Sequence, residues 1–571
     1  MIQAQSWQWG KSGGGGGSSP DVNDKEEVVS MVTDSQKNIY ILSKLFDDGQ
    51  QVAGQPVEFY DQPGDYDYII SSVACDGTYR WSKVIGGKGR ENLANLAIDS
   101  NDNLYLAGRL SVDQVSPFYP RRIANDLILA NNDYSILFLI KMNNLGVVQW
   151  IKRPLPSTTT ESQLGSRFIL QITIDSQGFI YCYSSFAPGI YCDGLFNATC
   201  PTYDNGRGAY YILKYDSNGN YINATYIDFK PKANQNFFAR NHNTGQFFVY
   251  GDRVGEGSNY YPSFAGQLLQ NSAYIACYGI DGQFLWKTEN VDTSASGAKM
   301  QTQNLVFDEQ NNIYVSARFV GTYVNNPLIS SFLGHSVTTP TIPATIFKID
   351  PTGQNLLWAT SSLSQICNEY GGIEYRNGKL GLTNYCGGAD YSWGNQTMTN
   401  VTNFNQGLKP LLARFNPATG ECIGLANIPN DLSTYDLGRT LAIDASGDFI
   451  IGGSFGSQLF VGPNTLTATG ASDFFIAKYS TTACSPLEVK NNEKPKNTLV
   501  AYPNPTNSII NICVNEACNF NIYSTTGAIV QKGIISREEN TIDISKLAVG
   551  AYTIVVITPA GLVSEVKVLR E

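Results

Sequence analysis

A segment that recurs with an aspartate at a fixed place constrains the fold of this 571-residue chain more than any other feature. In each copy an apolar run ends at the aspartate, a short Asn/Gly/Ser turn follows, and an aromatic or β-branched run returns, which is the pattern of a β-hairpin. Five clear copies occupy residues 31–45, 96–110, 172–186, 305–319 and 441–455, with the aspartates Asp34, Asp99, Asp175, Asp308 and Asp444. We expect each aspartate to hydrogen-bond its own turn.

The spacing of the copies predicts two more. Asp34 and Asp444 are 410 positions apart, which is six steps of about 68 residues, and a fixed period is the mark of a repeat fold. Residues 240–252 and 373–385 lie where this step expects degenerate copies, giving seven in all.

A second hairpin pattern follows each copy of the first. Four of its return strands carry a tryptophan: Trp81, Trp150, Trp286 and Trp358. Two hairpins per period make a four-stranded antiparallel unit, and seven such units predict an all-β chain folded as a seven-bladed β-propeller. The alternative is a set of hairpins in two sandwiches, which would not need a constant period.

The last unit lacks its fourth strand, and the N-terminus offers one. Residues 474–486 supply the first strand of the second hairpin, and there the pattern stops. At the start of the chain, residues 9–11 (Trp-Gly-Lys) align with residues 81–83 (Trp-Ser-Lys), and each triplet leads into glycines. We therefore expect the N-terminal strand to pair with residues 474–480 and to close the ring, which would remove an exposed sheet edge.

Composition excludes several classes of function. A net charge of −10 and a pI near 4.9 predict repulsion from phosphate backbones, so nucleic acid is not expected as a partner. No apolar run reaches the roughly 18 residues of a membrane-spanning helix. The two histidines, His242 and His335, are expected in surface loops, and their scarcity favours binding over catalysis. No metal or other cofactor is expected, and weak calcium binding at the Asp-rich turns is the exception left open.

The eleven cysteines show no zinc-binding spacing. Cys192 and Cys200 close a short loop and are predicted to form a disulfide outside the cytoplasm, as are Cys513 and Cys518 if their strands pair. The alternative is that these cysteines are reduced and buried.

The repeats resemble the bacterial β-propeller repeats of many secreted proteins, in which a glycine-rich turn, an aspartate turn and a Lys…Trp hairpin recur. The resemblance implies a propeller over residues 3–483 and implies little about function. Residues 484–497 are charged, contain proline and read as a linker. Residues 498–571 then show short alternating strands that predict a small C-terminal Ig-like β-sandwich.

This last segment closely resembles the type A C-terminal sorting domain of the type IX secretion system of Bacteroidetes. The matching positions are Tyr502, Pro503, Asn504, Pro505, Gly527, Leu547, Gly550, Tyr552 and Lys567. The resemblance implies export to the cell surface or medium, with the outer-membrane translocon, its shuttle protein and a surface sortase as partners. The sortase would cut in or near the linker. The alternative is a small accessory binding sandwich.

In antiparallel units of this kind the long loops between the two hairpins emerge on one face, where binding residues commonly lie. Their aromatic and basic residues are the candidate binding residues: Tyr119, Arg121, Arg122, Tyr191, Tyr203, Arg207, Tyr260, Tyr261 and Trp393, with Tyr391 beside the last. The favoured function is a surface module that binds a glycan or protein, in adhesion or gliding. The alternatives are a secreted polysaccharide hydrolase or lyase with carboxylates on the long-loop face, or a structural surface component.

Overall fold

The computed structural model describes most of the chain. The described residues are 5–16, 25–46, 49–60, 66–87, 91–111, 122–123, 127–128, 135–154, 168–199, 209–230, 236–252, 262–292, 299–320, 328–339, 343–363, 371–387, 390–399, 407–431, 436–481, 484, 501–512, 514, 516–524, 528–559 and 563–571. Every regular element among them is a β-strand, so the chain is all-β as predicted. Within these ranges there is no helix with the length and apolarity that membrane crossing requires.

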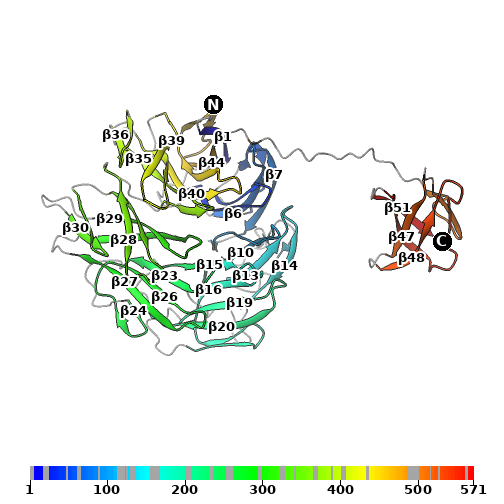
Figure 1. Cartoon of the computed structure of the whole chain (residues 1–571), viewed down its shortest axis with the longest axis horizontal. Coiled ribbons are helices and arrows are strands. Elements are labelled where there is room, and N and C mark those ends of the chain that lie inside the picture. The colour runs from blue at the N-terminus through cyan, green and yellow to red at the C-terminus, as the bar shows by residue number, and fades with distance from the viewer. Residues whose placement is uncertain are drawn as a thin grey trace. The chain divides into compact units, whose positions relative to one another are not determined.

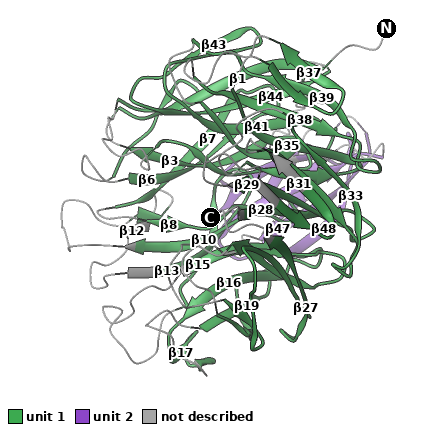
Figure 2. Cartoon of the chain, turned by 90° about the vertical axis from the view of Figure 1, so that its left-hand side faces the viewer, with its two compact units in different colours: residues 1–485 green, residues 486–571 purple. Residues whose placement is uncertain are grey.

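The chain divides into two compact units, residues 1–485 and residues 486–571 (Figure 2). The boundary falls inside the segment that the sequence marks as a linker. Of that segment only Cys484 is described, and it belongs to the first unit rather than to the linker.

In the described part of unit 1, seven antiparallel sheets with four core strands follow one another (Figure 1). Sheet 1 contains β2 (Val28–Thr33), β3 (Ile39–Phe46), β6 (Tyr66–Val73) and β7 (Tyr79–Gly86). Sheet 2 contains β8 (Asn92–Leu93) with β9 (Ala97–Ile98), β10 (Leu104–Ser111), β13 (Ser135–Met142) and β14 (Val148–Lys152). Sheet 3 contains β15 (Phe168–Ile174), β16 (Ile180–Phe186), β19 (Ala209–Tyr215) and β20 (Tyr221–Ile227). Sheets 4 and 5 are β22 (Asn236–Arg240), β23 (Phe247–Asp252), β26 (Ala273–Tyr278) and β27 (Phe284–Asp292); β28 (Lys299–Phe307), β29 (Ile313–Val320), β32 (Ala344–Ile349) and β33 (Leu356–Ser361). Sheets 6 and 7 are β34 (Ile373–Arg376), β35 (Lys379–Cys386), β38 (Lys409–Phe415) and β39 (Cys422–Asn427); β40 (Leu437–Ile443), β41 (Phe449–Phe455), β44 (Asp473–Ser480) and β1 (Ser6–Gly14).

The first strands of the seven sheets form a closed cycle. Each of β2, β9, β15, β22, β28, β34 and β40 contacts the next, and β40 contacts β2. A buried apolar cluster fills each space between consecutive sheets. For example, Leu42 and Ile70 of sheet 1 pack with Leu106 and Ile140 of sheet 2. Each sheet is therefore stabilised mainly by its two neighbours, because burial of apolar surface is the dominant favourable term in folding.

The repeated aspartates serve their turns as predicted. Asp34 Oδ1 accepts hydrogen bonds from the backbone N–H groups of Gln36 and Asn38, and Asp34 Oδ2 accepts one from the Tyr40 hydroxyl at 2.8 Å. The same pattern recurs at Asp99, Asp175 and Asp308. In the last copy the tyrosine is replaced by an isoleucine, and Lys478 Nζ contacts Asp444 Oδ2 at 2.8 Å instead. The two degenerate copies also form hairpins, β22–β23 and β34–β35.

The four tryptophans of the return strands, in sheets 1, 2, 4 and 5, join their own sheet to the next one. Trp81 Nε1 donates a hydrogen bond to the Asn144 carbonyl at 3.0 Å, and Trp358 Nε1 donates to the Pro417 carbonyl at 3.1 Å. The ring then lies on a turn glycine of the next sheet: a Cβ atom added at Gly146 would be 2.8 Å from the Trp81 ring. Since this glycine also has a φ of 77°, both its conformation and its contact with the tryptophan require the absence of a side chain.

The N-terminal strand closes the cycle, as the sequence predicts. β1 pairs antiparallel with β44, with Ser6 opposite Ser480 and Gly13 opposite Phe474. Figure 1 shows β1 beside β44. Trp9 repeats the contact of the other tryptophans: its Nε1 donates to the Cys75 carbonyl at 3.0 Å, and its ring lies against Gly77 of sheet 1.

A disulfide lies at the same junction. Cys75 and Cys484 are bonded across 409 residues of sequence, so the end of unit 1 is covalently tied to sheet 1. The predicted pairings are wrong: Cys192 and Cys518 are both buried free cysteines. Their proposed partners, Cys200 and Cys513, lie outside the described residues. Cys192 instead contacts the Tyr215 hydroxyl in the core between sheets 2 and 3.

A buried carboxyl group completes the junction. Glu26 is 3% exposed and accepts hydrogen bonds from the backbone N–H groups of Gly15 and Phe46 and from the Gln50 amide. Burial raises the pKa of Glu26 to about 8, and the nearby Asp473 carboxylate adds to the increase. The carboxyl group thus holds a proton at neutral pH, where the exposed group would be ionised.

The described part of unit 2 contains two sheets. One is formed by β45 (Ala501–Tyr502), β46 (Ile509–Ile512) and β49 (Thr541–Asp543), and the other by β48 (Ile529–Ile535), β47 (Cys518–Ser524), β50 (Gly550–Ile557) and β51 (Val563–Arg570). Their apolar residues share one core that includes Ile510, Ile522, Ile542 and Ile554.

We expect loss of the closing strand to destabilise unit 1. Deleting residues 6–12 removes the fourth strand of sheet 7 and the buried Trp9 ring, a change comparable to large-to-small core substitutions that cost about 3–5 kcal/mol. The double variant Cys75→Ser/Cys484→Ser should lose roughly 2–5 kcal/mol. Thermal denaturation and limited proteolysis measure both effects. Cys277→Ser, which changes a buried cysteine away from the junction, is the control. Unchanged melting of the deletion variant would contradict the role of β1.

We also expect the stability of the protein to fall as the pH rises from about 5 to 8. The folded state holds a proton on Glu26 that the unfolded chain releases above its ordinary pKa of 4.5, so the unfolded state binds fewer protons across this window. One such proton contributes a slope of at most about 1.4 kcal/mol per pH unit. Urea denaturation at several pH values should show a shallower slope for Glu26→Gln than for the wild type or for Glu421→Gln on an exposed turn. Equal slopes in all three would refute this explanation.

Candidate functional site

The described parts of the long loops form hairpins that lie against the preceding sheet. β4 (Gln51–Val52) pairs with β1, β11 (Arg122–Ile123) pairs with β7, and β30 (Leu328–Phe332) pairs with β27. β24 (Ser263–Phe264) pairs with β21 (Phe229–Lys230), which follows sheet 3. Single bridges place β36 (Asp390–Trp393) and β42 (Gln458–Val461) against the ends of sheets 5 and 6. These loops therefore join neighbouring sheets.

Several candidate binding residues belong to these hairpins and are buried. Tyr191 and Trp393 are both 0% exposed, as is Tyr391. Trp393 Nε1 donates to the Thr360 hydroxyl of sheet 5 at 2.8 Å, and the Tyr191 ring packs on Phe186. The prediction that Tyr191 and Trp393 bind a ligand is wrong, because rings with no exposed surface pack the loops onto their own scaffold.

Of the remaining candidates on the long-loop face, Arg122 is the one that lies among the described residues. Arg122 lies in β11 with its guanidinium 4.5 Å from the centre of the Tyr60 ring, which is a contact within the loop layer. The others lie outside the described residues: Tyr119, Arg121, Tyr203, Arg207, Tyr260 and Tyr261.

A local signal in the sequence marks these hairpins. Their turns carry a residue followed by glycine, both with positive φ: Ala53-Gly54, Asp193-Gly194, Ala265-Gly266 and Leu333-Gly334. Two such residues between short strands are typical of a tight hairpin. The pattern would have predicted structured loops on this face.

Three cavities of unit 1 that are lined by described residues lie elsewhere. The axial cavity, ≈ 570 Å³, is lined by the first strand of every sheet, from Val28 and Ser30 in sheet 1 to Thr440 in sheet 7. A second, the mouth cavity of ≈ 440 Å³, lies at the ends of these strands where the short first-hairpin turns gather. The two share Asn95, Gln171 and Glu374 in their linings.

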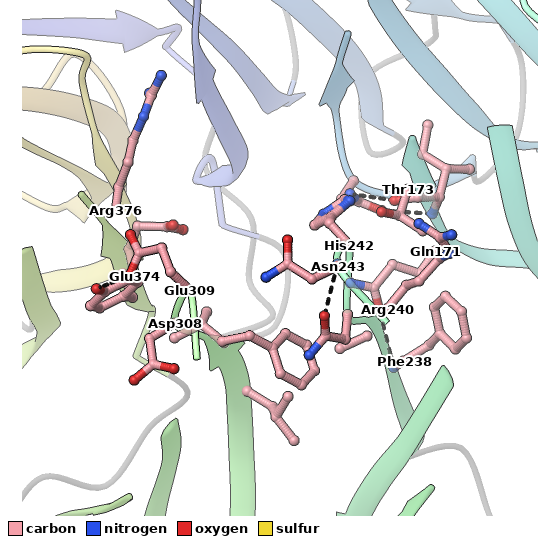
Figure 3. Close-up of a pocket in the computed structure, with 18 of the residues that line it drawn as sticks. Gln171, Thr173, Phe238, Arg240, His242, Asn243, Asp308, Glu309, Glu374 and Arg376 are labelled. Atoms are coloured by element: carbon pink, nitrogen blue, oxygen red, sulfur yellow. Dashed lines mark hydrogen bonds between the residues drawn. The ribbon is translucent and has the colours of Figure 1, made fainter. Parts of the chain in front are cut away.

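Acidic and basic groups face one another across the mouth cavity. Figure 3 shows Arg240, His242 and Asn243 on one wall, with Glu309 and Glu374 opposite. Beside these carboxylates, Arg376 Nη1 donates to the Thr33 hydroxyl and to the Ile443 carbonyl, each at 2.9 Å. Arg376 thus ties the turn of sheet 6 to sheets 1 and 7.

Glu374 is the cavity carboxyl with the most altered acidity. Burial raises its pKa to about 7, although the Arg376 cation acts in the opposite direction. In contrast, Glu27 in the axial cavity lies in a network of cations, 3.3 Å from Lys44 Nζ and 3.1 Å from Arg439 Nε. Glu374 is therefore placed to exchange a proton near neutral pH.

A third cavity, the side cavity of ≈ 530 Å³, opens between the turns of sheets 3 and 4. It shares Arg240, His242 and Asn243 with the mouth cavity and adds Asp175 and Lys214. These three cavities place the candidate site on the axis and the short-turn face, and not on the long-loop face predicted from the sequence.

The two histidines take different places. His242 is an exposed turn residue as expected, and partial desolvation of its ring, together with the Arg240 cation, lowers its pKa. His335 starts the strand β31 (His335–Thr339) instead of lying in a loop, and partial burial lowers its pKa too.

No cluster of three His, Cys, Asp or Glu side chains suited to a metal ion occurs within the described ranges. Weak calcium binding at the Asp-rich turns remains a prediction, and the oxygens of those aspartates are already occupied by their own turns.

In unit 2 the motif residues at the two ends of the domain meet. Asn504 Nδ2 donates to the Lys567 carbonyl, and Asn504 Oδ1 accepts from the Leu569 N–H, each at 2.8 Å. The Tyr502–Pro503 and Asn504–Pro505 peptide bonds that flank Asn504 are cis. The entry motif is thereby fixed to the final strand.

The segment 542–552, which carries the motif residues Leu547, Gly550 and Tyr552, is also held by hydrogen bonds. Arg570 donates to the carbonyls of Ile544 and Ser545, and the Tyr552 hydroxyl donates to the Ala548 carbonyl at 2.7 Å. Leu547 packs against the core, and Gly550 begins β50. Gly527 lies outside the described residues.

Comparison with known proteins identifies this second unit. Residues 500–568 match the family described as the secretion system C-terminal sorting domain. The chain is therefore a cargo of the type IX secretion system, exported to the cell surface or into the medium. No curated protein matches the chain.

Solved structures resemble the chain only distantly. The quinohemoprotein alcohol dehydrogenase from Comamonas testosteroni is 12% identical, with 84% of this chain and 77% of that chain covered and a TM-score of 0.34. A protein of unknown function from Dyadobacter fermentans is 11% identical, covering 69% and 97% with a TM-score of 0.35. The V. cholerae biofilm matrix protein Bap1 is 11% identical, covering 84% and 91% with a TM-score of 0.24. These scores are too low to transfer any property.

Proposed function

We propose that this protein is a surface-displayed binding module. In this proposal unit 1 is a seven-bladed β-propeller that binds a glycan or protein, in adhesion or gliding, and unit 2 is an Ig-like sandwich that addresses it for export. The closed cycle of first strands and the seven four-stranded sheets support the propeller. The two packed sheets of unit 2 around one core support the sandwich.

The observation that carries the binding role is the axial cavity with its polar mouth. A cavity of several hundred Å³ with a few convergent polar groups is the usual form of a ligand site. Arginine, histidine, asparagine and carboxylate side chains around the mouth suit a hydroxyl-rich or charged ligand.

The export role rests on unit 2. We infer that the outer-membrane translocon, its shuttle protein and a surface sortase recognise this domain, and that the sortase cuts between the units. The hydrogen bonds that join Asn504 to β51 and Arg570 to residues 544–545 bring the segments around residues 504, 544 and 570 together, which supports recognition of the folded domain as one unit.

We expect a chain that ends at residue 497 to accumulate in the periplasm. Unit 1 keeps its own core and disulfide in such a chain, so it should fold without an address. Cell fractionation and surface labelling measure delivery, and an unchanged melting temperature of unit 1 shows that folding is intact. Asn504→Ala, which cuts the link between the entry motif and β51, should reduce delivery in the full chain. Normal surface delivery of the truncated chain would rule out the address.

A second candidate function is cleavage of a polysaccharide, by hydrolysis or by a lyase reaction. The observation that favours it is Glu374, a cavity carboxyl whose pKa is raised to about 7, as a general acid requires. The carboxylates in question lie at the mouth cavity, with Glu309 in the same lining, and not on the long-loop face.

One experiment separates the two candidates. We expect the purified chain to bind members of a glycan array without releasing reducing sugar from the same glycans. Loss of a general acid lowers a rate by about 10²–10⁴-fold. If reducing sugar is released, and Glu374→Gln lowers the rate of release 100-fold or more, unit 1 is an enzyme and the binding-module proposal is wrong. Glu421→Gln is the matched control on an exposed turn.

A further inference from the structure

A cross-strand Tyr–Lys pair recurs in three sheets of unit 1. Tyr105 lies opposite Lys141 in sheet 2, Tyr181 opposite Lys214 in sheet 3, and Tyr314 opposite Lys348 in sheet 5. In each pair the ammonium lies over the ring of the tyrosine, at 5.3, 5.4 and 4.8 Å from its centre. The same type of Tyr–Lys pair therefore occurs in three different surroundings.

In sheets 2 and 5 the lysine has a polar partner. Lys141 Nζ donates to the Ser217 carbonyl of the next sheet at 3.2 Å. Lys348 Nζ donates to the Pro417 carbonyl at 3.1 Å and lies 3.0 Å from Asp308 Oδ2. Each of these ammonium groups thus has an oxygen partner in the protein.

In sheet 3 the lysine lacks such a partner. Lys214 Nζ lies 4.0 Å from the centre of the Phe179 ring, and among the described residues it forms no hydrogen bond or ion pair. The carboxylate that would correspond to Asp308 is Asp175, which is approached instead by Arg240 from sheet 4, with Nη2 at 3.7 Å from Asp175 Oδ2. At this place there is thus one carboxylate, Asp175, for two cations, Lys214 and Arg240.

Arg240 is itself incompletely satisfied. Its side chain is 7% exposed, and its guanidinium lies 4.1 Å from the centre of the Tyr181 ring. Its Nε and Nη1 atoms donate no hydrogen bond to any described residue, and the distance to Asp175 exceeds that of a hydrogen bond. Buried charged donors without acceptors are costly, so an acceptor supplied by a ligand would stabilise this arrangement.

The side cavity brings these groups to one place. Lys214, Arg240 and Asp175 are its charged lining residues, joined by His242. Its other polar lining residues include Asn223, Thr225, Asn243 and Thr244, whose amides and hydroxyls can bond to hydroxyl groups.

We propose that the side cavity between sheets 3 and 4 binds an acidic sugar, with Arg240 and Lys214 holding the sugar carboxylate and the amides and hydroxyls of Asn223, Thr225 and Asn243 holding its hydroxyl groups. The proposal deepens the binding role proposed for unit 1 and rests on it. A carboxylate between two cations supplies the acceptors that both lack, and charge-assisted hydrogen bonds of this kind are stronger than neutral ones.

The test uses the purified full-length chain at neutral pH and three probes: D-glucuronate, D-glucose as its neutral counterpart, and sodium sulfate as a free anion. Ligand-observed NMR titration should show saturable binding of glucuronate and none of glucose at equal concentration. Arg240→Gln should weaken glucuronate binding about 10-fold or more, as expected for loss of a charge-assisted hydrogen bond, and Lys214→Gln should weaken it several-fold. Lys141→Gln, the same substitution at the matched pair of sheet 2, should leave it unchanged.

Three outcomes would overturn the proposal. The first is the absence of glucuronate binding, and the second is binding that neither Arg240→Gln nor Lys214→Gln reduces in correctly folded protein. The third is binding of sulfate with the same dependence on Arg240 while glucuronate does not compete, which would make the cavity a site for a free anion. Glycan binding elsewhere on unit 1 that these variants leave intact would keep the binding module and remove only the acidic-sugar site.

Discussion

The pairing of the first strand of the chain with the last strand of unit 1 is the interaction on which the rest of the structure depends. A sheet in a closed cycle buries its apolar residues only against its two neighbours, so a missing neighbour exposes two clusters at once. β1 supplies the fourth strand of sheet 7, and Trp9 joins that sheet to sheet 1 through its hydrogen bond to the Cys75 carbonyl. The Cys75–Cys484 disulfide and the buried Glu26 secure the same junction with a covalent bond and with backbone hydrogen bonds.

Local patterns with a clear physical cause could be predicted from the sequence. The aspartate turns depend on residues a few positions apart, and the role of Trp9 could be inferred because Trp81 stands in the same pattern. The disulfide could not, since proximity of Cys75 and Cys484 results from ring closure and not from spacing. The candidate site was sought among the aromatic residues of the long loops, but hydrophobic rings such as Tyr191 and Trp393 serve equally well to pack a loop, and composition does not separate the two uses.

The cavities owe their chemistry to small differences among similar sheets. Tyr105, Tyr181 and Tyr314 occupy one place in the repeat, and the lysines opposite them are also alike. A single arginine from a neighbouring first strand changes the balance of charge at one of the three. A repeat of this kind provides a constant scaffold on which one altered position creates a specific site, so the residues that depart from the repeat are the ones to consult for function.

The closing strand also has a consequence for the order of events during synthesis. β1 leaves the ribosome before the other strands of unit 1, but the strand it pairs with ends at residue 480, so sheet 7 stays incomplete until nearly all of unit 1 has been made. Until then the chain carries an unpaired edge, which is the state in which multi-strand proteins are most prone to aggregate. A protein whose sorting domain follows unit 1 in the chain is thus supplied with its address only after the ring has all its parts.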